Sequence, residues 1–95
     1  MRIRWTPGAR RDLEEIDAYI AQDSPSAATR VSTAIFDQTD ALALHPHLGR
    51  PGRVPDTREL VITSTPYIVP YRVRDQVVEL LAVLHGAQNW PGEFG

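Results

Sequence analysis

The second half of the chain reads RELVIT at 58–63, YIVPYRVR at 67–74 and VVELLAVLH at 77–85. All three stretches are rich in β-branched, aliphatic or aromatic residues, and turn residues separate them. The last stretch is apolar on both faces until its final residue, apart from Glu79, which is typical of a central strand. These patterns predict three consecutive strands that pair antiparallel.

Pro70 is unusual inside a strand because it has no backbone N–H to donate to a neighbour. It predicts a bulge, or a position whose nitrogen faces away from the adjacent strand. His85 ends the last predicted strand, and strict alternation places it on the same face as Leu81 and Val83. A strand-end histidine is most often structural, but an imidazole also suits proton transfer near neutral pH.

A short strand and a helix are predicted at the start of the chain. Residues 3–5 alternate apolar and charged side chains, as a strand does. Thr6 then provides an N-cap, and Pro7 is well suited to the first helical position. The helix extends to Gln22 or Asp23, and its apolar stripe is formed by Ala9, Leu13, Ile16 and Ile20.

A second helix of similar length follows almost immediately. Ser24-Pro25 repeats the start signal, and the helix runs to about Leu44 before Pro46 stops it. Gln38 is the single polar interruption of a stripe formed by Ala28, Val31, Ile35 and Leu42. Two amphipathic helices joined by so short a link form an antiparallel hairpin.

The resulting order, β-α-α-β-β-β, predicts an α+β fold in which the helical hairpin packs on a small antiparallel sheet. A chain of 95 residues predicts one domain, spanning 1–95. It contains no cysteine, no apolar run of the ~18 residues that a membrane span needs, and no apolar signal region at its start, so we expect a cytoplasmic protein. The expected core consists of Leu13, Ile16, Ile20, Val31, Ile35, Leu42 and Leu81.

Charge is unevenly distributed along the chain. The net charge of −2 argues against binding nucleic acid through bulk electrostatics. All ten basic residues are arginine, and five of them lie between 50 and 74, whereas seven of the twelve acidic residues lie between 12 and 40. The basic second half is therefore the candidate binding region, with Arg50, Arg53, Arg58, Arg72 and Arg74 as its cationic residues.

The connection at 45–57 is rich in proline and glycine and has no periodicity, which predicts a loop. Arg50 and Arg53 lie there in the sequence GRPGR, which is typical of a mobile basic loop. His45 and His47 flank a proline, but no third nitrogen or thiolate ligand lies nearby. We therefore predict no metal site and no cofactor.

The order of these elements, with GRPGR at 49–53, PYIVPYRV at 66–73 and VLHGAQNWP at 83–91, resembles the RelE/ParE family of bacterial toxins. Members of this family are the toxic halves of type II toxin–antitoxin pairs. The resemblance implies the same α+β fold, growth inhibition, plasmid stabilization and a cognate antitoxin as partner in a hetero-oligomer. An acidic antitoxin segment would cover the arginines, and Gln88 and Trp90 join them as candidate antitoxin- or target-binding residues.

Two targets are consistent with the resemblance. ParE members inhibit DNA gyrase through protein contacts and need no catalytic residues. RelE members cut mRNA on the ribosome without a metal, and in that activity His85 would be the general acid while Arg58 and Arg72 bind the phosphate. One competing interpretation is that each of these arginines is a solvated strand residue or pairs with Glu59 or Glu79. Another is that the protein is a non-toxic binding partner with a toxin fold.

Departures from the ribonuclease pattern favour gyrase inhibition. The chain has no lysine, and Ile68 stands where family ribonucleases often place an arginine. Gln88 stands where many members have an arginine after the last strand, and only Trp90 matches the tyrosine that often follows. The residues alone leave open whether the protein is an enzyme.

Overall fold

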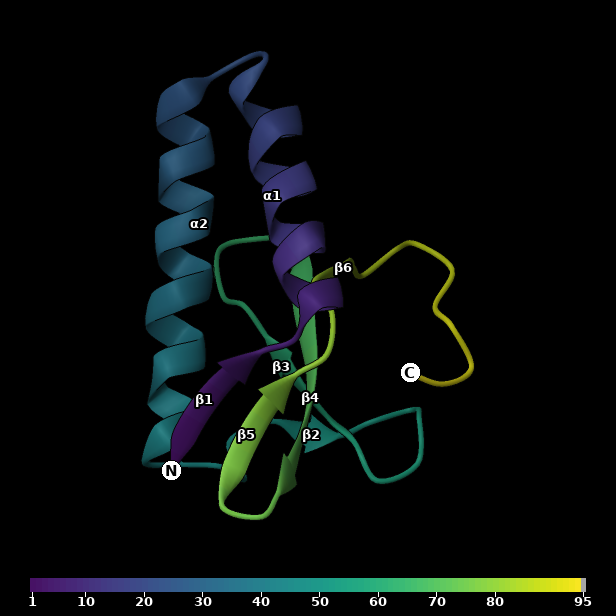
Figure 1. Ribbon diagram of the computed structural model, residues 1–95. Helices are drawn as coiled ribbons and strands as arrows, with labels where there is room; N and C mark the ends of the chain where they lie inside the picture. The colour runs from purple at the N-terminus through teal and green to yellow at the C-terminus, as the bar shows by residue number, and fades with distance from the viewer. Residues whose placement is uncertain (95) are drawn as a thin grey trace.

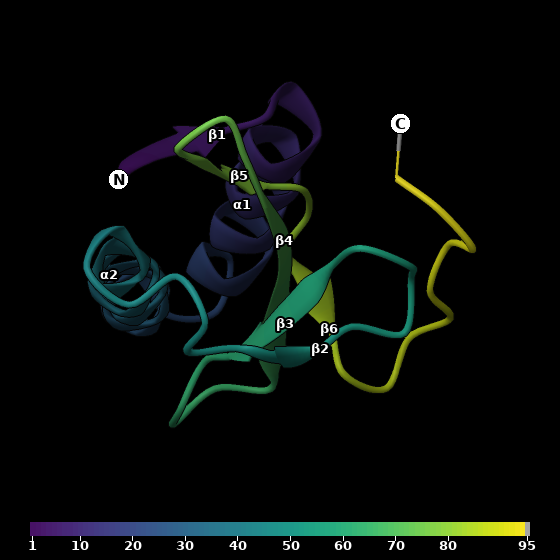
Figure 2. The ribbon, with the colours of Figure 1, turned by 90° about the horizontal axis from the view of Figure 1, so that it is seen from below.

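The computed structural model describes residues 1–94 and has the predicted α+β architecture (Figure 1). Two antiparallel helices stand side by side over a curved sheet, and Figure 2 shows both on the same side of it. The elements are β1 (Arg2–Trp5), α1 (Pro7–Ala21), α2 (Pro25–Asp40), the 3₁₀ turn η1 (Ala41–Ala43), β2 (Arg50–Pro51), β3 (Arg58–Val61), β4 (Tyr67–Arg74), β5 (Val77–Leu80) and β6 (Leu84–His85).

Both helices begin where the sequence predicts. Thr6 and Ser24 are the N-caps, and their hydroxyl oxygens accept the backbone N–H groups of Ala9 at 3.3 Å and Ala27 at 3.1 Å. The Thr6 hydroxyl also donates to the Leu80 carbonyl at 2.7 Å, which ties the start of α1 to the end of β5. Across residues 1–94, no helix is long and apolar enough to cross a membrane.

The sheet has the order β1-β5-β4-β3-β2, and β6 pairs with the start of β4. β3, β4 and β5 pair antiparallel, as predicted. β1 departs from the predicted antiparallel sheet because it pairs with β5 in parallel, with Trp5 opposite Leu80. Thr6 explains this direction, since its backbone N–H and its hydroxyl both donate to the Leu80 carbonyl and so bring the two strand ends together.

The single strand predicted at 77–85 is interrupted, because residues 81–83 separate β5 from β6. In the register of β4 and β5, Pro70 comes opposite Leu81, and the Leu81 N–H donates to the Pro70 carbonyl at 2.9 Å. Pro70 has no N–H to return, so the ladder breaks at this pair. The nitrogen of Pro70 thus faces β5 and divides the predicted strand.

The core lies between the hairpin and the sheet. Of the predicted core residues, Leu81 is buried but lies outside the main buried cluster, and Ile20 is only half-buried. The other predicted core residues belong to the cluster or pack against it: Leu13, Ile16, Val31, Ile35 and Leu42. The buried cluster consists of Ala9, Leu13, Ile35, Leu42, Leu60, Ile62, Val69, Tyr71, Val78, Leu80 and Val83.

We expect Leu42→Ala to lower the free energy of unfolding by about 2–5 kcal/mol, because Leu42 is fully buried and its removal leaves a cavity. Leu44→Ala removes the same atoms from a side chain that is 82% exposed, and should cost less than about 0.5 kcal/mol. Equilibrium urea unfolding of both variants measures the difference. Equal losses would contradict the burial of Leu42 in the core.

Candidate functional site

A buried carboxylate organises the connection between η1 and β3. Glu59 lies on β3 with 3% of its side chain exposed. Arg50 donates to its Oε1 from Nε at 3.1 Å and from Nη2 at 3.0 Å. Arg53 donates to its Oε2 from the backbone N–H at 2.9 Å and from Nε at 3.1 Å. Arg50, Glu59 and Arg53 are called here the Glu59 cluster. The prediction of a mobile basic loop was wrong, because both loop arginines are tied to β3.

Two further side chains hold the same connection. Tyr71 is fully buried, and its hydroxyl accepts the Gly49 N–H at 2.9 Å and donates to the Pro46 carbonyl at 2.8 Å. Arg58 donates to the Gly49 carbonyl at 2.7 Å. A Cβ atom at Gly49 would lie 2.6 Å from the Tyr71 ring, so this close approach requires glycine. Burial raises the pKa of the Tyr71 phenol, which keeps its proton available for donation.

The Glu59 carboxylate is stabilised in its charged form. Burial by itself raises the pKa of Glu59, but hydrogen bonds from the Arg53 N–H and from the two guanidinium groups outweigh it, so the net pKa is lowered. A lowered pKa in the folded state stabilises the fold at pH values above the unfolded value of about 4.3. This stabilisation is lost as the pH falls through the lower pKa of the folded state.

Glu79 on β5 is arranged in the same way. It accepts a hydrogen bond from Arg4 Nη1 at 2.8 Å and another from Arg72 Nε at 2.9 Å. The bond from Arg72 is the main reason that the pKa of Glu79 is lowered; burial opposes it, and the charges of Arg72, Arg74 and Arg4 add to it. In each of the two clusters one carboxylate meets two guanidinium groups, so each cluster keeps one positive charge in excess.

Strand register places both clusters on one face of the sheet, because residues directly opposite each other share a face. Arg4 and Arg72 both lie opposite Glu79. Glu59 lies opposite Pro70, two residues before Arg72 on β4, so it shares their face. The helices cover the other face (Figure 2). The helix-free face is called here the basic sheet surface, and its arginines are Arg2, Arg4, Arg50, Arg53, Arg72 and Arg74.

Arg58 and Arg72, which were predicted to reach a shared concave surface, border the same hollow from opposite faces of the sheet. Arg58 lies opposite Tyr71, on the helix side of the sheet, whereas Arg72 lies on the basic sheet surface. Both side chains border a hollow of about 320 Å³, but Arg58 bonds the Gly49 carbonyl and Arg72 bonds Glu79. The competing prediction of a glutamate partner therefore holds for Arg72 and not for Arg58.

The predicted C-terminal binding residues both make contacts within the chain. The guanidinium carbon of Arg53 lies 3.6 Å from the centre of the Trp90 ring, a cation–π contact that joins this segment to the Glu59 cluster. The Trp90 indole N–H is buried and has no hydrogen-bond partner within residues 1–94. The Gln88 side-chain oxygen accepts the backbone N–H of His85 at 2.6 Å.

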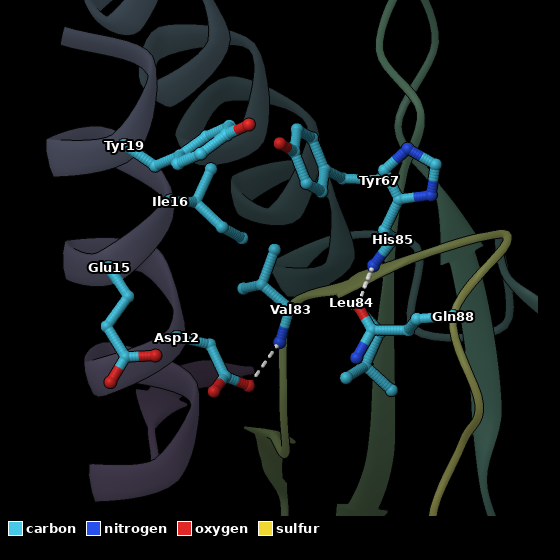
Figure 3. Close-up of a pocket in the computed structure, with 9 residues that line it drawn as sticks. All are labelled: Asp12, Glu15, Ile16, Tyr19, Tyr67, Val83, Leu84, His85 and Gln88. Carbon is cyan, nitrogen blue, oxygen red and sulfur yellow. Dashed lines mark hydrogen bonds between the residues drawn. The ribbon is translucent and has the colours of Figure 1, made fainter. Parts of the chain in front are cut away.

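His85 borders a pocket of about 400 Å³ between α1 and the β4–β6 pair (Figure 3). It lies opposite Tyr67, and the two rings meet edge to face with their centres 5.8 Å apart. Its Nδ1 accepts the Ala87 N–H at 3.1 Å, which leaves Nε2 to carry the proton of the neutral ring. This His85 pocket is lined by Asp12, Glu15, Ile16, Tyr19, Tyr67, Val83, Leu84, His85 and Gln88.

The wall of the His85 pocket that α1 supplies is acidic. Figure 3 shows Asp12 and Glu15 on one side and His85 on the other, with Val83 between them. Asp12 is fixed there because its Oδ2 accepts the Val83 N–H at 3.0 Å. Burial raises the pKa of Asp12 against the effect of this hydrogen bond, and the charge of Glu15 raises it further. Within the described part of the chain, no arginine lines this pocket.

The three predicted catalytic residues do not come together in one site. His85 pairs with Tyr67, five residues before Arg72 on the same strand, which corresponds to about 16 Å along β4. Arg58 lies opposite Tyr71, four residues from Tyr67, and bonds a carbonyl of the 45–57 connection. The imidazole and the two guanidinium groups therefore occupy different ends of the sheet.

A second hollow, of about 420 Å³, lies at the open edge of β3. Leu48 and Val61 border it with 57% and 45% of their side chains exposed. β2 pairs with only the first two residues of β3, and the Gln38 amide bonds the Thr63 N–H at 2.8 Å and its carbonyl at 3.2 Å. Between β2 and Gln38, the backbone N–H and C=O of Val61 point outward from the sheet edge and pair with nothing else in residues 1–94. This hollow is called here the β3-edge groove.

Several of these residues were not predicted as parts of a site. Gln38 carried a signal, since it interrupts an apolar helix stripe, and its amide proves to cap a strand edge. Asp12 carried no such signal in the sequence, because its partner Val83 lies far away along the chain. Glu59 was considered only as a partner of Arg58 or Arg72, and Tyr71 only as a strand residue.

Comparison with known proteins agrees with this fold. A sequence profile described as "ParE toxin of type II toxin-antitoxin system, parDE" matches residues 3–90. A Sinorhizobium fredii protein named "Putative toxin Y4kP" is 56% identical over 91 residues, which cover 95% of this chain and 93% of that protein. Toxin RelE2 of Caulobacter vibrioides is 37% identical over 87 residues, covering 92% of this chain and 97% of that toxin.

A solved chain from the "Chromosomal ParDE TA system from P. aeruginosa" superposes with a TM-score of 0.77 at 30% identity, covering 87% of this chain and 92% of that one. The fold and these relatives define a toxin of the type II toxin–antitoxin class. The chain belongs to the ParE toxin family, within the wider RelE/ParE group. Membership of this family implies an antitoxin partner.

We expect Glu59→Gln to lower the free energy of unfolding by about 1–3 kcal/mol at pH 7, because the amide cannot serve both arginines as a charged acceptor. The difference from the unmodified protein should shrink as the pH falls below the unfolded value of about 4.3 and then through the lowered pKa of Glu59 in the folded state. Urea unfolding between pH 3 and 7 measures both effects. Glu93→Gln is the control at an exposed position, and a loss for Glu59→Gln that stays constant with pH would contradict the assignment.

Proposed function

We propose that the protein arrests growth by binding DNA gyrase and inhibiting it through protein contacts, as ParE members of the family do. The observation that carries this proposal is where the charged side chains lie relative to His85. The His85 pocket has two carboxylates and no arginine among its described lining residues, whereas the arginines between 50 and 74 lie on the basic sheet surface or, in the case of Arg58, bond backbone carbonyls. Since gyrase works in the cytoplasm, we place the action there.

The charge of the His85 pocket argues against RNA cleavage at this site. A ribonuclease without a metal needs cationic groups on the scissile phosphate, whose transition state carries additional negative charge. Here a phosphate next to His85 would meet Asp12 and Glu15 instead. Two like charges 4 Å apart repel by about 1 kcal/mol in water and about 4 kcal/mol near a protein surface. The pocket therefore opposes the ligand that a ribonuclease must hold.

The alternative is a RelE-like, ribosome-dependent mRNA endonuclease with His85 as general acid and Arg58 and Arg72 on the phosphate. One observation favours it: His85 is exposed at a pocket, and its Nε2 is the nitrogen that carries the proton. In this alternative, the ribosome would have to supply the missing positive charge at His85. Arg72 would have to leave Glu79, or act where it is.

Two surfaces suit the proposed partners. The basic sheet surface keeps an excess of positive charge, which suits an acidic segment of the antitoxin or of gyrase. We assign the β3-edge groove to an apolar helix face of the antitoxin, because Leu48 and Val61 are exposed there. A long added strand would fit less well, since β2 and Gln38 already cover the edge on either side of Val61.

His85→Ala separates the two candidate functions. If the protein inhibits gyrase, expression of the variant should still arrest growth and induce the DNA-damage response, because the imidazole is exposed and makes few contacts. If it is a ribonuclease, loss of the general acid should lower the rate about 10²–10⁴-fold and abolish the arrest. Growth curves and a DNA-damage reporter measure the outcome. Loss of arrest in a variant that remains folded by thermal melting would overturn the proposal.

Val61→Glu tests the antitoxin groove. A carboxylate placed beside Leu48 in an apolar groove should weaken binding of the cognate antitoxin at least about tenfold, because it would be desolvated without a partner. Val73→Glu makes the same change at an exposed strand position outside the groove, and should leave the affinity within about twofold. Titration calorimetry with purified antitoxin measures both. Equal effects of the two variants would speak against the groove as the docking site.

A further inference from the structure

The His85 pocket has a composition that the proposed toxic activity does not use. Its floor is apolar, with Ile16, Val83 and Leu84, and the rings of Tyr19 and Tyr67 face each other at one end (Figure 3). Asp12 and Glu15 stand at the other end, one helical turn apart on the same face of α1. The pocket thus combines an apolar base, aromatic rings and two neighbouring carboxylates.

These two carboxylates lack the ion pairs that compensate the two sheet glutamates. Glu59 and Glu79 each bind two guanidinium groups. Asp12 accepts only a backbone N–H from Val83, and neither it nor Glu15 forms an ion pair within residues 1–94. Asp12 is half-buried and Glu15 is exposed at the mouth of the pocket, so a cation placed between them would offset the cost of burying the Asp12 charge.

The rest of the pocket suits the side chains that carry such a cation. Arginine and lysine have long aliphatic stems that pack on apolar surface while their charged ends stay with polar groups. A guanidinium group also stacks on aromatic rings such as those of Tyr19 and Tyr67. A small inorganic cation would leave the apolar floor uncovered, and within residues 1–94 no group of three or more metal-ligating side chains exists.

We propose that the His85 pocket receives an arginine or lysine side chain of the antitoxin, with its cationic end at Asp12 and Glu15 and its stem against Ile16 and Val83. This inference rests on the antitoxin partnership proposed above and names a second point of contact, distinct from the β3-edge groove. The polarity is opposite to that of the basic sheet surface. An antitoxin that bridges both must therefore present acidic residues to one surface and a basic residue to the other, which makes recognition specific.

The test is the double variant Asp12→Asn/Glu15→Gln, which keeps the shape of both side chains and removes their charge. Its affinity for the purified cognate antitoxin should fall at least about tenfold, because the basic side chain would be desolvated without its counter-charges. Glu14→Gln is the matched control: it removes one charge from the same helix at an exposed position outside the pocket. Its affinity should stay within about twofold. Thermal melting verifies that both variants fold.

A second arm identifies the partner residue. Glu15→Arg should weaken the complex further than Glu15→Gln, and an antitoxin in which one basic residue is replaced by glutamate should restore the affinity. Unchanged affinity of the double variant would overturn the inference and leave the antitoxin partnership intact. Unchanged affinity together with loss of growth arrest would also overturn it, by assigning the pocket to the target. If the unmodified toxin does not bind its antitoxin at all, the partnership itself fails.

Discussion

The carboxylate of Glu59 is the interaction on which the open side of this molecule depends. It is buried on β3 and accepts four short hydrogen bonds, from the Arg50 guanidinium and from the backbone and side chain of Arg53. Arg53 in turn stacks on Trp90, so the C-terminal segment reaches the sheet through the same cluster. A buried charge is tolerated only when its partners are complete. Loss of any one of them would therefore affect β2, the 45–57 connection and the C-terminal segment together.

The local features of the fold were predictable from the sequence. The helix starts at Thr6-Pro7 and Ser24-Pro25 depend only on residues that are adjacent in the sequence. The apolar stripes predicted which helix faces are buried. Features that depend on pairing between distant residues were not. The missing N–H of Pro70 was visible, but only the register shows that it faces β5 and interrupts the predicted strand at residue 81. The parallel pairing of β1 likewise depends on the bonds from Thr6 to Leu80.

The site was predicted less completely because the distribution of charge along the sequence differs from its distribution in the folded protein. The basic half of the sequence contains the two glutamates that hold three of its arginines, and Glu59 could not be assigned to Arg50 and Arg53 by spacing alone. Conversely, Asp12 belongs to the acidic half of the sequence but lies beside His85 from the other end of the chain. This folding of an acidic helix against the histidine strand is what makes the His85 pocket unsuitable for a phosphate and suitable for a cation.

We infer that the protein arrests growth through contacts with gyrase and without catalysis. The most direct measurement adds purified, antitoxin-free toxin to DNA gyrase and relaxed plasmid in one reaction, and to translating ribosomes with a defined mRNA in another. If the protein inhibits gyrase by contact, supercoiling should be lost and restored by the antitoxin, and the mRNA should stay intact. Codon-phased cuts in ribosome-bound mRNA, with supercoiling unaffected at the same toxin concentration, would contradict this inference.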